Sequence, residues 1–132
     1  MAGRLLPDTN AIIALMRGDA SAARAFDDAA EVVLSAVVLG ELTYGAMNSR
    51  SPEANLANLE RLGEQCTFAP VDGIVVRRYG QVRLALKRKG RPIPENDIWI
   101  AATAIALDAT LLTDNSHFDE VDGLDLERLF AR

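Results

Sequence analysis

Cysteine and histidine are nearly absent from this chain, which holds one residue of each among its 132. The lone Cys66 cannot form an internal disulfide, so we expect a cytoplasmic setting, where disulfides are rare. A single histidine is too few for a site built from paired imidazoles. No Ser-His-Asp or Cys-His arrangement can be assembled around His117. We expect His117 to lie at the surface or to support another site residue.

Long apolar runs are also missing. The longest, residues 32–39 around Ser35, falls far short of the roughly 20 residues that a bilayer crossing needs. At the N-terminus one arginine is followed by a proline and an aspartate, which is not the order of a signal peptide. The glycines form neither a Walker loop nor a dinucleotide-binding fingerprint. We therefore predict no membrane span and no site of either nucleotide-binding type.

Acidic residues are absent between Asp72 and Glu95, although the whole chain has a net charge of −5. That net charge argues against binding nucleic acid by bulk electrostatics. The acid-free stretch carries half of the 14 basic residues: Arg77, Arg78, Arg83, Lys87, Arg88, Lys89 and Arg91. One surface is therefore expected to be positive, either as a solvated helix face or as a contact for a polyanion.

What the chain does contain fits one domain over residues 1–132. Apolar residues make up 49% and charged residues 25%, as in soluble folded proteins, and the length is too short for two ordinary domains. Short apolar runs predict strands at residues 4–7, 32–34, 66–71 and 110–113, with a weaker edge strand at 124–129. Segments of helical period predict helices at residues 11–17, 21–29, 36–46, 52 to about 63, 72–89 and 94–107.

Local signals mark several of these boundaries. Ser35 and Ser51 are predicted helix N-caps, and Gly90 is predicted to end the basic helix. Strands that alternate with helices imply crossover connections, and apolar strands without polar alternation imply a sheet covered on both faces. We therefore predict an α/β fold with a mainly parallel central sheet and helices on both sides.

Four acidic residues fall where such a sheet would place a site. Ligands of open parallel sheets bind outside the carboxyl ends of the strands. Asp8 and Asp114 each follow a predicted strand, Asp97 lies in a first helical turn, and Glu41 lies in the helix that leaves the second strand. Each residue also has a structural explanation, as a turn, a cap or a partner of the helix dipole. The sequence therefore permits a shared site without requiring one.

If these carboxylates meet, they need a positive partner. Two of them about 4 Å apart repel by roughly 4 kcal/mol at an effective dielectric constant near 20. Ligands that are all oxygen, without thiolate or imidazole, favour a hard cation such as Mg²⁺ or Mn²⁺ over Zn²⁺. Such an ion activates water and stabilises charge on a phosphoryl group, so metal-assisted phosphodiester hydrolysis is the chemistry that we expect. The basic stretch would then hold a polyanionic substrate by its phosphates.

Several segments together resemble one family. LLPDTNAIIALMRGD, SAVVLGELTYGA, PENDIWIAATAIALDATLLTDNSHF and DEVDGLDL are similar to segments of the PIN-domain ribonucleases, specifically the VapC-type toxins of bacterial toxin–antitoxin pairs. The resemblance covers nearly the whole chain. It implies a PIN-like α/β/α sandwich and an Mg²⁺- or Mn²⁺-dependent endoribonuclease. It also implies a homodimer and a cognate VapB-type antitoxin that binds the toxin and blocks its site.

The resemblance also implies roles for individual residues. Asp8, Glu41 and Asp97 match the family's metal-ligating acids, and Asn10 would orient Asp8. The fourth acidic position falls on Asp114 or Asn115; we assign Asp114 to the metal or its water and Asn115 to a supporting position. The residues assigned to RNA binding are Arg83, Lys87, Arg88, Lys89 and Arg91.

Two other functions remain as alternatives. A phosphoacceptor domain of receiver type also uses clustered acids and Mg²⁺, but it needs a lysine just past a late strand. The only lysines here, Lys87 and Lys89, belong to the basic helix. The other alternative is a non-catalytic binding module whose acids are caps and turns.

Overall fold

Five parallel strands form the central sheet of this computed structural model, which describes residues 3–129. The strands are β1 (Arg4–Pro7), β2 (Glu31–Ser35), β3 (Thr67–Ala69), β4 (Thr110–Thr113) and β5 (Leu126–Arg128), in the spatial order β3-β2-β1-β4-β5. The bounds of β1 and β4 are those predicted. β3 is shorter than predicted, and the predicted edge strand is confirmed as β5.

Six α-helices and one short 3-10 helix accompany the described strands. They are α1 (Thr9–Met16), α2 (Ala20–Asp28), α3 (Ala36–Met47), α4 (Pro52–Glu64), α5 (Gly73–Lys89), α6 (Glu95–Ala106) and the 3-10 helix η1 (Ser116–Glu120). Ser35 caps α3 by accepting a hydrogen bond from the Val38 amide, as predicted. Ser51 occupies the N-cap position of α4 and Pro52 opens the helix, as predicted, but the Ser51 side chain makes no capping hydrogen bond. Gly90 ends α5 with a φ of 69°, a left-handed conformation that glycine adopts without strain.

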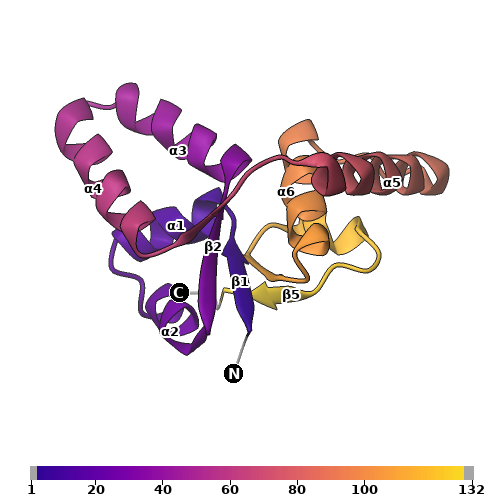
Figure 1. Cartoon of the computed structure of the whole chain (residues 1–132), viewed down its shortest axis with the longest axis horizontal. Helices are drawn as coiled ribbons and strands as arrows, with labels where there is room; N and C mark the ends of the chain where they lie inside the picture. Colours follow the sequence, from indigo (N-terminus) through magenta and orange to yellow (C-terminus); the bar gives the residue numbers. More distant parts are fainter. Residues whose placement is uncertain (1–2, 130–132) are drawn as a thin grey trace.

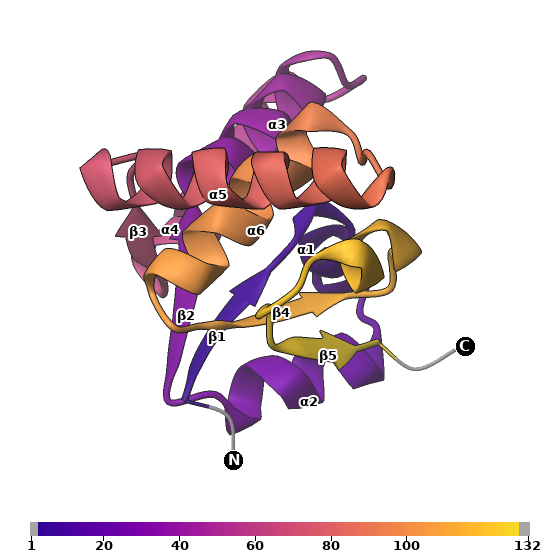
Figure 2. The same ribbon diagram turned by 90° about the vertical axis from the view of Figure 1, so that its right-hand side faces the viewer.

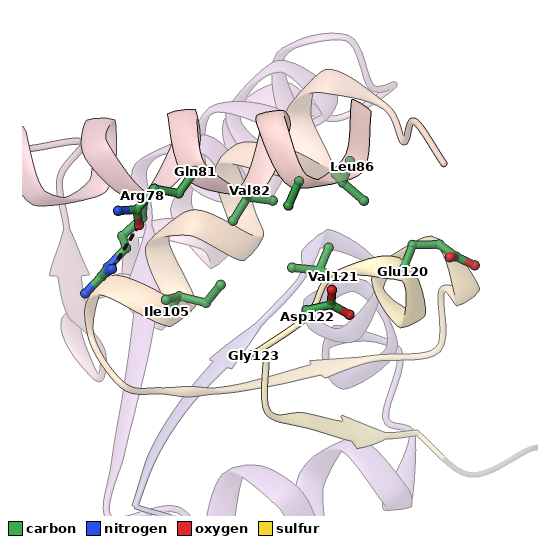
Figure 3. A pocket seen from close by; sticks show the side chains of 10 residues that line it. Arg78, Gln81, Val82, Leu86, Ile105, Glu120, Val121, Asp122 and Gly123 are labelled. Atoms are coloured by element: carbon green, nitrogen blue, oxygen red, sulfur yellow. Dashed lines mark hydrogen bonds between the residues drawn. The ribbon is translucent and has the colours of Figure 1, made fainter. Parts of the chain in front are cut away.

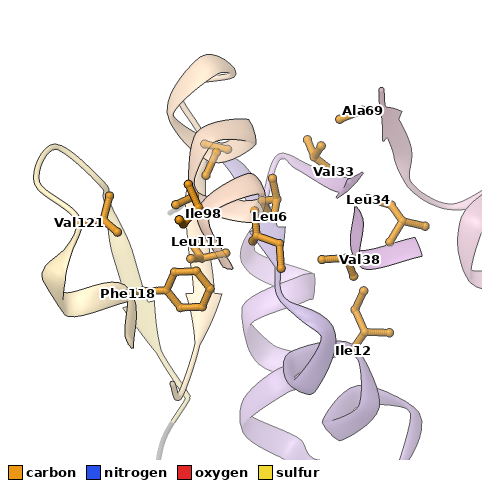
Figure 4. Close-up of a cluster of buried hydrophobic side chains, with 14 of the residues drawn as sticks. Leu6, Ile12, Val33, Leu34, Val38, Ala69, Ile98, Leu111, Phe118 and Val121 are labelled. Carbon is orange, nitrogen blue, oxygen red and sulfur yellow. The ribbon is translucent and has the colours of Figure 1, made fainter. Parts of the chain in front are cut away.

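Helices cover both faces of the sheet, which confirms the predicted α/β/α arrangement. Figure 2 shows α5 and α6 on one side of the strands and α2 on the other. Successive strand residues point to opposite faces, so Leu6 and Leu111 pack under α6 while Leu5 and Leu112 pack against α1 and α2. Figure 4 shows the larger of these two clusters, with Phe118 closing it beside Leu111. Each such buried side chain contributes roughly 1.5–3 kcal/mol of hydrophobic stabilisation.

Helices α3 and α4 form a hairpin that projects from the sheet in Figure 1. The apolar face of α4 turns inward, because Leu59 is buried and Leu62 packs against the same core. Along residues 3–129, no helix combines the length and apolar character that a membrane crossing requires.

The strand order places a change of direction beside β1. From β1 the chain builds the sheet outward through β2 and β3, and it then returns to add β4 and β5 on the other side of β1. Open sheets bind ligands at such a switch point, at the carboxyl ends of the strands. The Asp8 amide donates to the Leu112 carbonyl at 3.0 Å, so the ends of β1 and β4 lie side by side. The residues after these two strands are therefore neighbours.

Candidate active site

Asp8 is the most buried of the predicted site residues, with 4% of its surface exposed. It caps α1, and its Oδ1 accepts a hydrogen bond of 2.8 Å from the Ala11 amide. Its Oδ2 accepts a hydrogen bond from the hydroxyl of Thr113, the last residue of β4. The hydrogen bonds described for this carboxylate therefore come from Thr113 and Ala11 rather than from Asn10, which the resemblance had implied.

Burial raises the pKa of Asp8 above its ordinary value. The hydrogen bonds from Thr113 and Ala11 act in the opposite direction, and the negative charges of Asp114 and Asp97 raise the pKa further. The carboxylates of Asp114 and Asp97 thus lie close enough to Asp8 to affect its ionisation.

Glu41 approaches the site from α3. The Thr9 hydroxyl donates to its Oε1 at 2.6 Å, and the Asn96 side-chain amide donates to its Oε2 at 3.3 Å. Each of these two donors is the sequence neighbour of a predicted ligand, Asp8 or Asp97. Sequence reasoning did not identify Thr9 or Asn96, and their adjacency to the acids was the signal that could have done so.

Asp97 reaches the site from the first turn of α6. Its Oδ2 lies 3.1 Å from Nδ1 of His117, so His117 supports a site residue, as predicted. Burial raises the pKa of Asp97, the hydrogen bond and charge of His117 lower it, and the charge of Glu41 raises it again. Asp97 therefore responds electrostatically to Glu41, as Asp8 does to Asp97.

These acids border a common cavity of about 500 Å³, which we call the acidic cavity. Its lining residues are Asp8, Thr9, Asn10, Glu41, Pro94, Glu95, Asn96, Asp97, Ile100, Asn115 and His117. The structure therefore brings together Asp8, Glu41 and Asp97, which come from three segments far apart in sequence. An arrangement of carboxylates around one solvent-filled space can bind a cation or position a water molecule.

The fourth acidic position divides between two neighbours. Asp114 is exposed and does not line the acidic cavity, although its charge contributes to the raised pKa of Asp8. Asn115 does line it, and its side-chain oxygen accepts a 2.9 Å hydrogen bond from the His117 amide. The Asn115 amide donates to the Thr113 hydroxyl at 2.9 Å. Asn115 thus connects the two side chains that support Asp8 and Asp97.

The described acidic side chains are not oriented as a complete set of metal ligands. Among residues 3–129, no three His, Cys, Asp or Glu side chains are grouped so that they could hold a metal ion. The carboxylates instead accept hydrogen bonds from Thr113, Thr9 and Asn96. The carboxylate, amide and hydroxyl oxygens of the polar side chains that line the cavity still fit a hard divalent cation, with the His117 ring as the nitrogen donor beside them.

The five residues assigned to RNA binding differ in their surroundings. Arg83 forms an ion pair with Glu95, at the edge of the acidic cavity. Lys89 donates to the Glu120 carbonyl and pairs with Asp122, on the far end of α5. The other three, Lys87, Arg88 and Arg91, are exposed. We call all five the basic surface.

A second cavity, of about 210 Å³, lies between α5, α6 and the loop after η1. Figure 3 shows apolar side chains such as Val82, Ile105 and Val121 in its walls, with charged groups at its rim. It shares no lining residue with the acidic cavity and contains none of the acids that the sequence singled out. Because the acidic cavity is bordered by Asp8, Glu41 and Asp97 together, we take it as the candidate active site.

Comparison with known proteins agrees with this geometry. Residues 5–124 match the model of the PIN domain family. The "tRNA(fMet)-specific endonuclease VapC" of Shigella flexneri is 33% identical over 127 residues, covering 94% of this chain and 96% of that protein. "Ribonuclease VapC1" of Haemophilus influenzae strain R2866 is 36% identical over 84 residues, and there the alignment spans 64% of this chain and 63% of the relative.

Solved structures show the same similarity in three dimensions. A chain in the crystal structure of VapBC2 from Rickettsia felis, bound to a DNA fragment from their promoter, superimposes with a TM-score of 0.87 at 29% identity, covering 96% of this chain and 99% of that one. The DNA-bound VapBC structure from Salmonella typhimurium gives a TM-score of 0.88 at 29% identity, covering 98% and 100%. The chain therefore belongs to the PIN domain family, with the VapC ribonucleases among its homologues.

Proposed function

We propose that this protein is an Mg²⁺- or Mn²⁺-dependent endoribonuclease that hydrolyses RNA phosphodiester bonds, acting as the toxin of a VapBC-type pair. The observation that carries the proposal is the meeting of Asp8, Glu41 and Asp97 around one cavity at the carboxyl edge of the sheet. The names of the VapC relatives, which are ribonucleases, support the same chemistry.

The three carboxylates would hold the divalent ion, and Asp114 or Asn115 would assist at its edge. When bound, such an ion lowers the pKa of a water molecule and stabilises negative charge on a phosphoryl group. Asp8 and Asp97 have raised pKa values in the protein without an ion, because burial and neighbouring charges disfavour their ionised forms. A cation would remove this disadvantage, so ion binding and carboxylate ionisation should be coupled.

The hydrogen-bonding partners have a separate task, which is to hold the carboxylates in place. Thr113 and the Ala11 amide fix both oxygens of Asp8, and Thr9 with Asn96 fixes both oxygens of Glu41. Carboxylates oriented in advance lose less freedom when they bind an ion or a water molecule. The basic surface would hold the RNA by its phosphates.

The test replaces Asp97 by asparagine, which removes the charge and keeps the shape. Cleavage of total RNA with Mn²⁺ should fall by about a thousandfold or more, because the variant would lack one of the three carboxylates that would hold the ion. Mn²⁺ titration of the same variant by calorimetry should show weakened binding. Asp28→Asn, an exposed site on α2, is the matched control and should cleave as the wild type does. Equal cleavage by Asp97→Asn and wild type would end the proposal.

The partners follow from the same proposal. RNA is the substrate, a VapB-type antitoxin is the inhibitor, and the protein acts as a homodimer in the cytoplasm. Support for the antitoxin comes from the structural relatives in Rickettsia felis and Salmonella typhimurium, which are VapBC structures. The receiver-type alternative is not favoured, because neither Lys87 nor Lys89 lines the acidic cavity.

A further inference from the structure

Three polar side chains form a closed hydrogen-bonded group where α5 passes the start of α6. Arg83 Nη1 lies 3.3 Å from Glu95 Oε1 and donates to the Tyr79 hydroxyl at 2.6 Å. The Tyr79 hydroxyl in turn donates to Glu95 Oε2. The Tyr79 ring stacks on Trp99, with ring centroids 3.8 Å apart and planes 15° apart. These contacts link Arg83, Tyr79 and Glu95 to one another and, through the Trp99 ring, to α6.

Glu95 connects this group to the acidic cavity. It is one of the residues that line the cavity, and it precedes Asp97 by two positions in the first turn of α6. Arg83 is therefore separated from the cavity by one side chain. Lys89, by contrast, is held at Asp122 and the Glu120 carbonyl, and neither of these lines the acidic cavity. Among the five residues of the basic surface, Arg83 is the one whose described ion pair is with a residue that lines the acidic cavity, Glu95.

The pairing between Arg83 and Glu95 is of a kind that solvent weakens. The side chains are 62% and 52% exposed, and ion pairs this exposed contribute little to stability. A phosphate offers the guanidinium two oxygens and a comparable or larger negative charge, which suits the planar fork of arginine. Exchange of the Glu95 carboxylate for a phosphate is therefore energetically accessible.

We propose that Arg83 contacts an RNA backbone phosphate at the mouth of the acidic cavity, and that Glu95 occupies this contact until RNA displaces it. This inference rests on the proposed ribonuclease function, because it assumes that RNA enters the acidic cavity. Tyr79 would keep Arg83 oriented before and after the exchange, since its ring is held by Trp99. Glu95 is then an internal competitor of the substrate.

The experiment is a double-mutant cycle on RNA binding without cleavage. A short fluorescein-labelled single-stranded RNA is titrated with each protein in EDTA, and fluorescence anisotropy gives the dissociation constant. Glu95→Gln should bind about threefold to fivefold more tightly than wild type, because Arg83 is released. Its affinity should also depend more steeply on salt. One added phosphate contact changes the slope of the logarithm of the binding constant against the logarithm of the salt concentration by about 0.7. Arg83→Gln should bind about threefold more weakly.

The decisive measurement is the pair Arg83→Gln and Arg83→Gln/Glu95→Gln. If Glu95 acts by occupying Arg83, the two proteins bind RNA equally, because there is no guanidinium left to release. If Glu95→Gln still tightens binding without Arg83, Glu95 acts only as a negative charge near the substrate, and the inference is overturned. Weaker binding by Glu95→Gln than by wild type also overturns it, since Glu95 would then support the site directly. Glu95→Ala repeats the test with a different replacement.

Failure of this inference can be told apart from failure of the proposed function. A wild-type protein that binds and cleaves RNA but gives an additive cycle overturns the role of Glu95 alone. A wild-type protein that shows neither RNA binding in EDTA nor cleavage with Mn²⁺ overturns both proposals.

Discussion

Asp8 and Glu41 in the acidic cavity differ from Lys87 and Arg88 on the basic surface in how firmly their charged groups are held. Asp8 is buried and receives hydrogen bonds on both oxygens, and Glu41 likewise has a donor at each oxygen. On the basic surface, Lys87 and Arg88 are exposed near the end of α5. Groups that are held in place can support a reaction that tolerates little displacement, whereas exposed cations can follow a flexible polyanion. Substitutions in the two regions should therefore differ in size and in kind.

The largest effect that we expect from a supporting residue is at Thr113. Thr113→Val keeps the shape of the side chain and removes the hydroxyl that donates to Asp8. Loss of such a partner typically costs 10- to 100-fold in metal affinity or activity, so RNA cleavage with Mn²⁺ should fall by about that factor. Thr103→Val is the matched control: Thr103 is also buried, but its hydroxyl donates to the Trp99 carbonyl within α6. Equal losses in the two variants would mean that Thr113 acts through packing alone.

A smaller effect is expected at Thr9, which supports the less buried Glu41. Thr9→Val removes the donor to Oε1 and leaves Asn96 as the partner of the other oxygen. The rate of RNA cleavage should fall about tenfold, at the lower end of the range for residues that orient metal ligands. Thr43→Val on α3 provides the comparison, since its hydroxyl donates to the Leu39 carbonyl. If Thr9→Val reduced the rate of RNA cleavage as much as Thr113→Val does, the burial of the supported carboxylate would not determine how much each hydrogen bond contributes.

The contrast between these regions could be predicted from the sequence only in part. Asp8 was placed at the carboxyl edge because it follows an apolar run, and parallel strands share that edge. Asp97 was placed by its position in a first helical turn. Which hydroxyl or amide meets each carboxylate depends on the register Pro7↔Leu112 and on side-chain rotamers, which no local pattern encodes. Thr113 and Asn96 were missed for this reason.

The fourth acidic position shows the same limit at a single residue. The sequence offered Asp114 and Asn115 as neighbours, and a carboxylate was preferred on chemical grounds. Asp114 follows the last residue of β4, is exposed and does not line the acidic cavity, although its negative charge raises the pKa of Asp8. The Asn115 amide then bonds back to Thr113 and the chain turns into η1, which returns Asn115 to the cavity. The role of either residue toward an ion stays a prediction.

Stability should also reveal what it costs to bury the charge of Asp8, with a smaller contribution from the nearby charges of Asp114 and Asp97. In EDTA, Asp8→Asn should raise the thermal midpoint at neutral pH by about 2–5 °C, the change that roughly 1 kcal/mol produces in a domain of this size. Asparagine still caps a helix, while the buried charge is gone. The folded-state pKa of Asp8 is raised, so a protonated Asp8 favours the folded state. This contribution of Asp8 to the free energy of unfolding is fully present below the ordinary carboxyl pKa and is lost as pH rises through the raised value.

The difference between variant and wild type should therefore vanish near pH 4 and grow toward neutral pH, as followed by circular dichroism melts at several pH values. Saturating Mg²⁺ should reduce the difference, because an ion that binds the folded wild type stabilises it. An unchanged midpoint difference at every pH would show that the Asp8 charge costs the fold nothing.

The smallest effects are expected on the basic surface away from the cavity. Lys87→Gln or Arg88→Gln should raise the KM for RNA about twofold to threefold with little change in kcat, because an exposed phosphate contact binds substrate and transition state alike. Each should also reduce the salt dependence of RNA binding by about 0.7 in slope. Arg24→Gln, an exposed cation on α2, should change neither quantity. If Arg24→Gln has the same effect as the α5 variants, the RNA responds to the net charge of the protein and the basic surface is not its binding site.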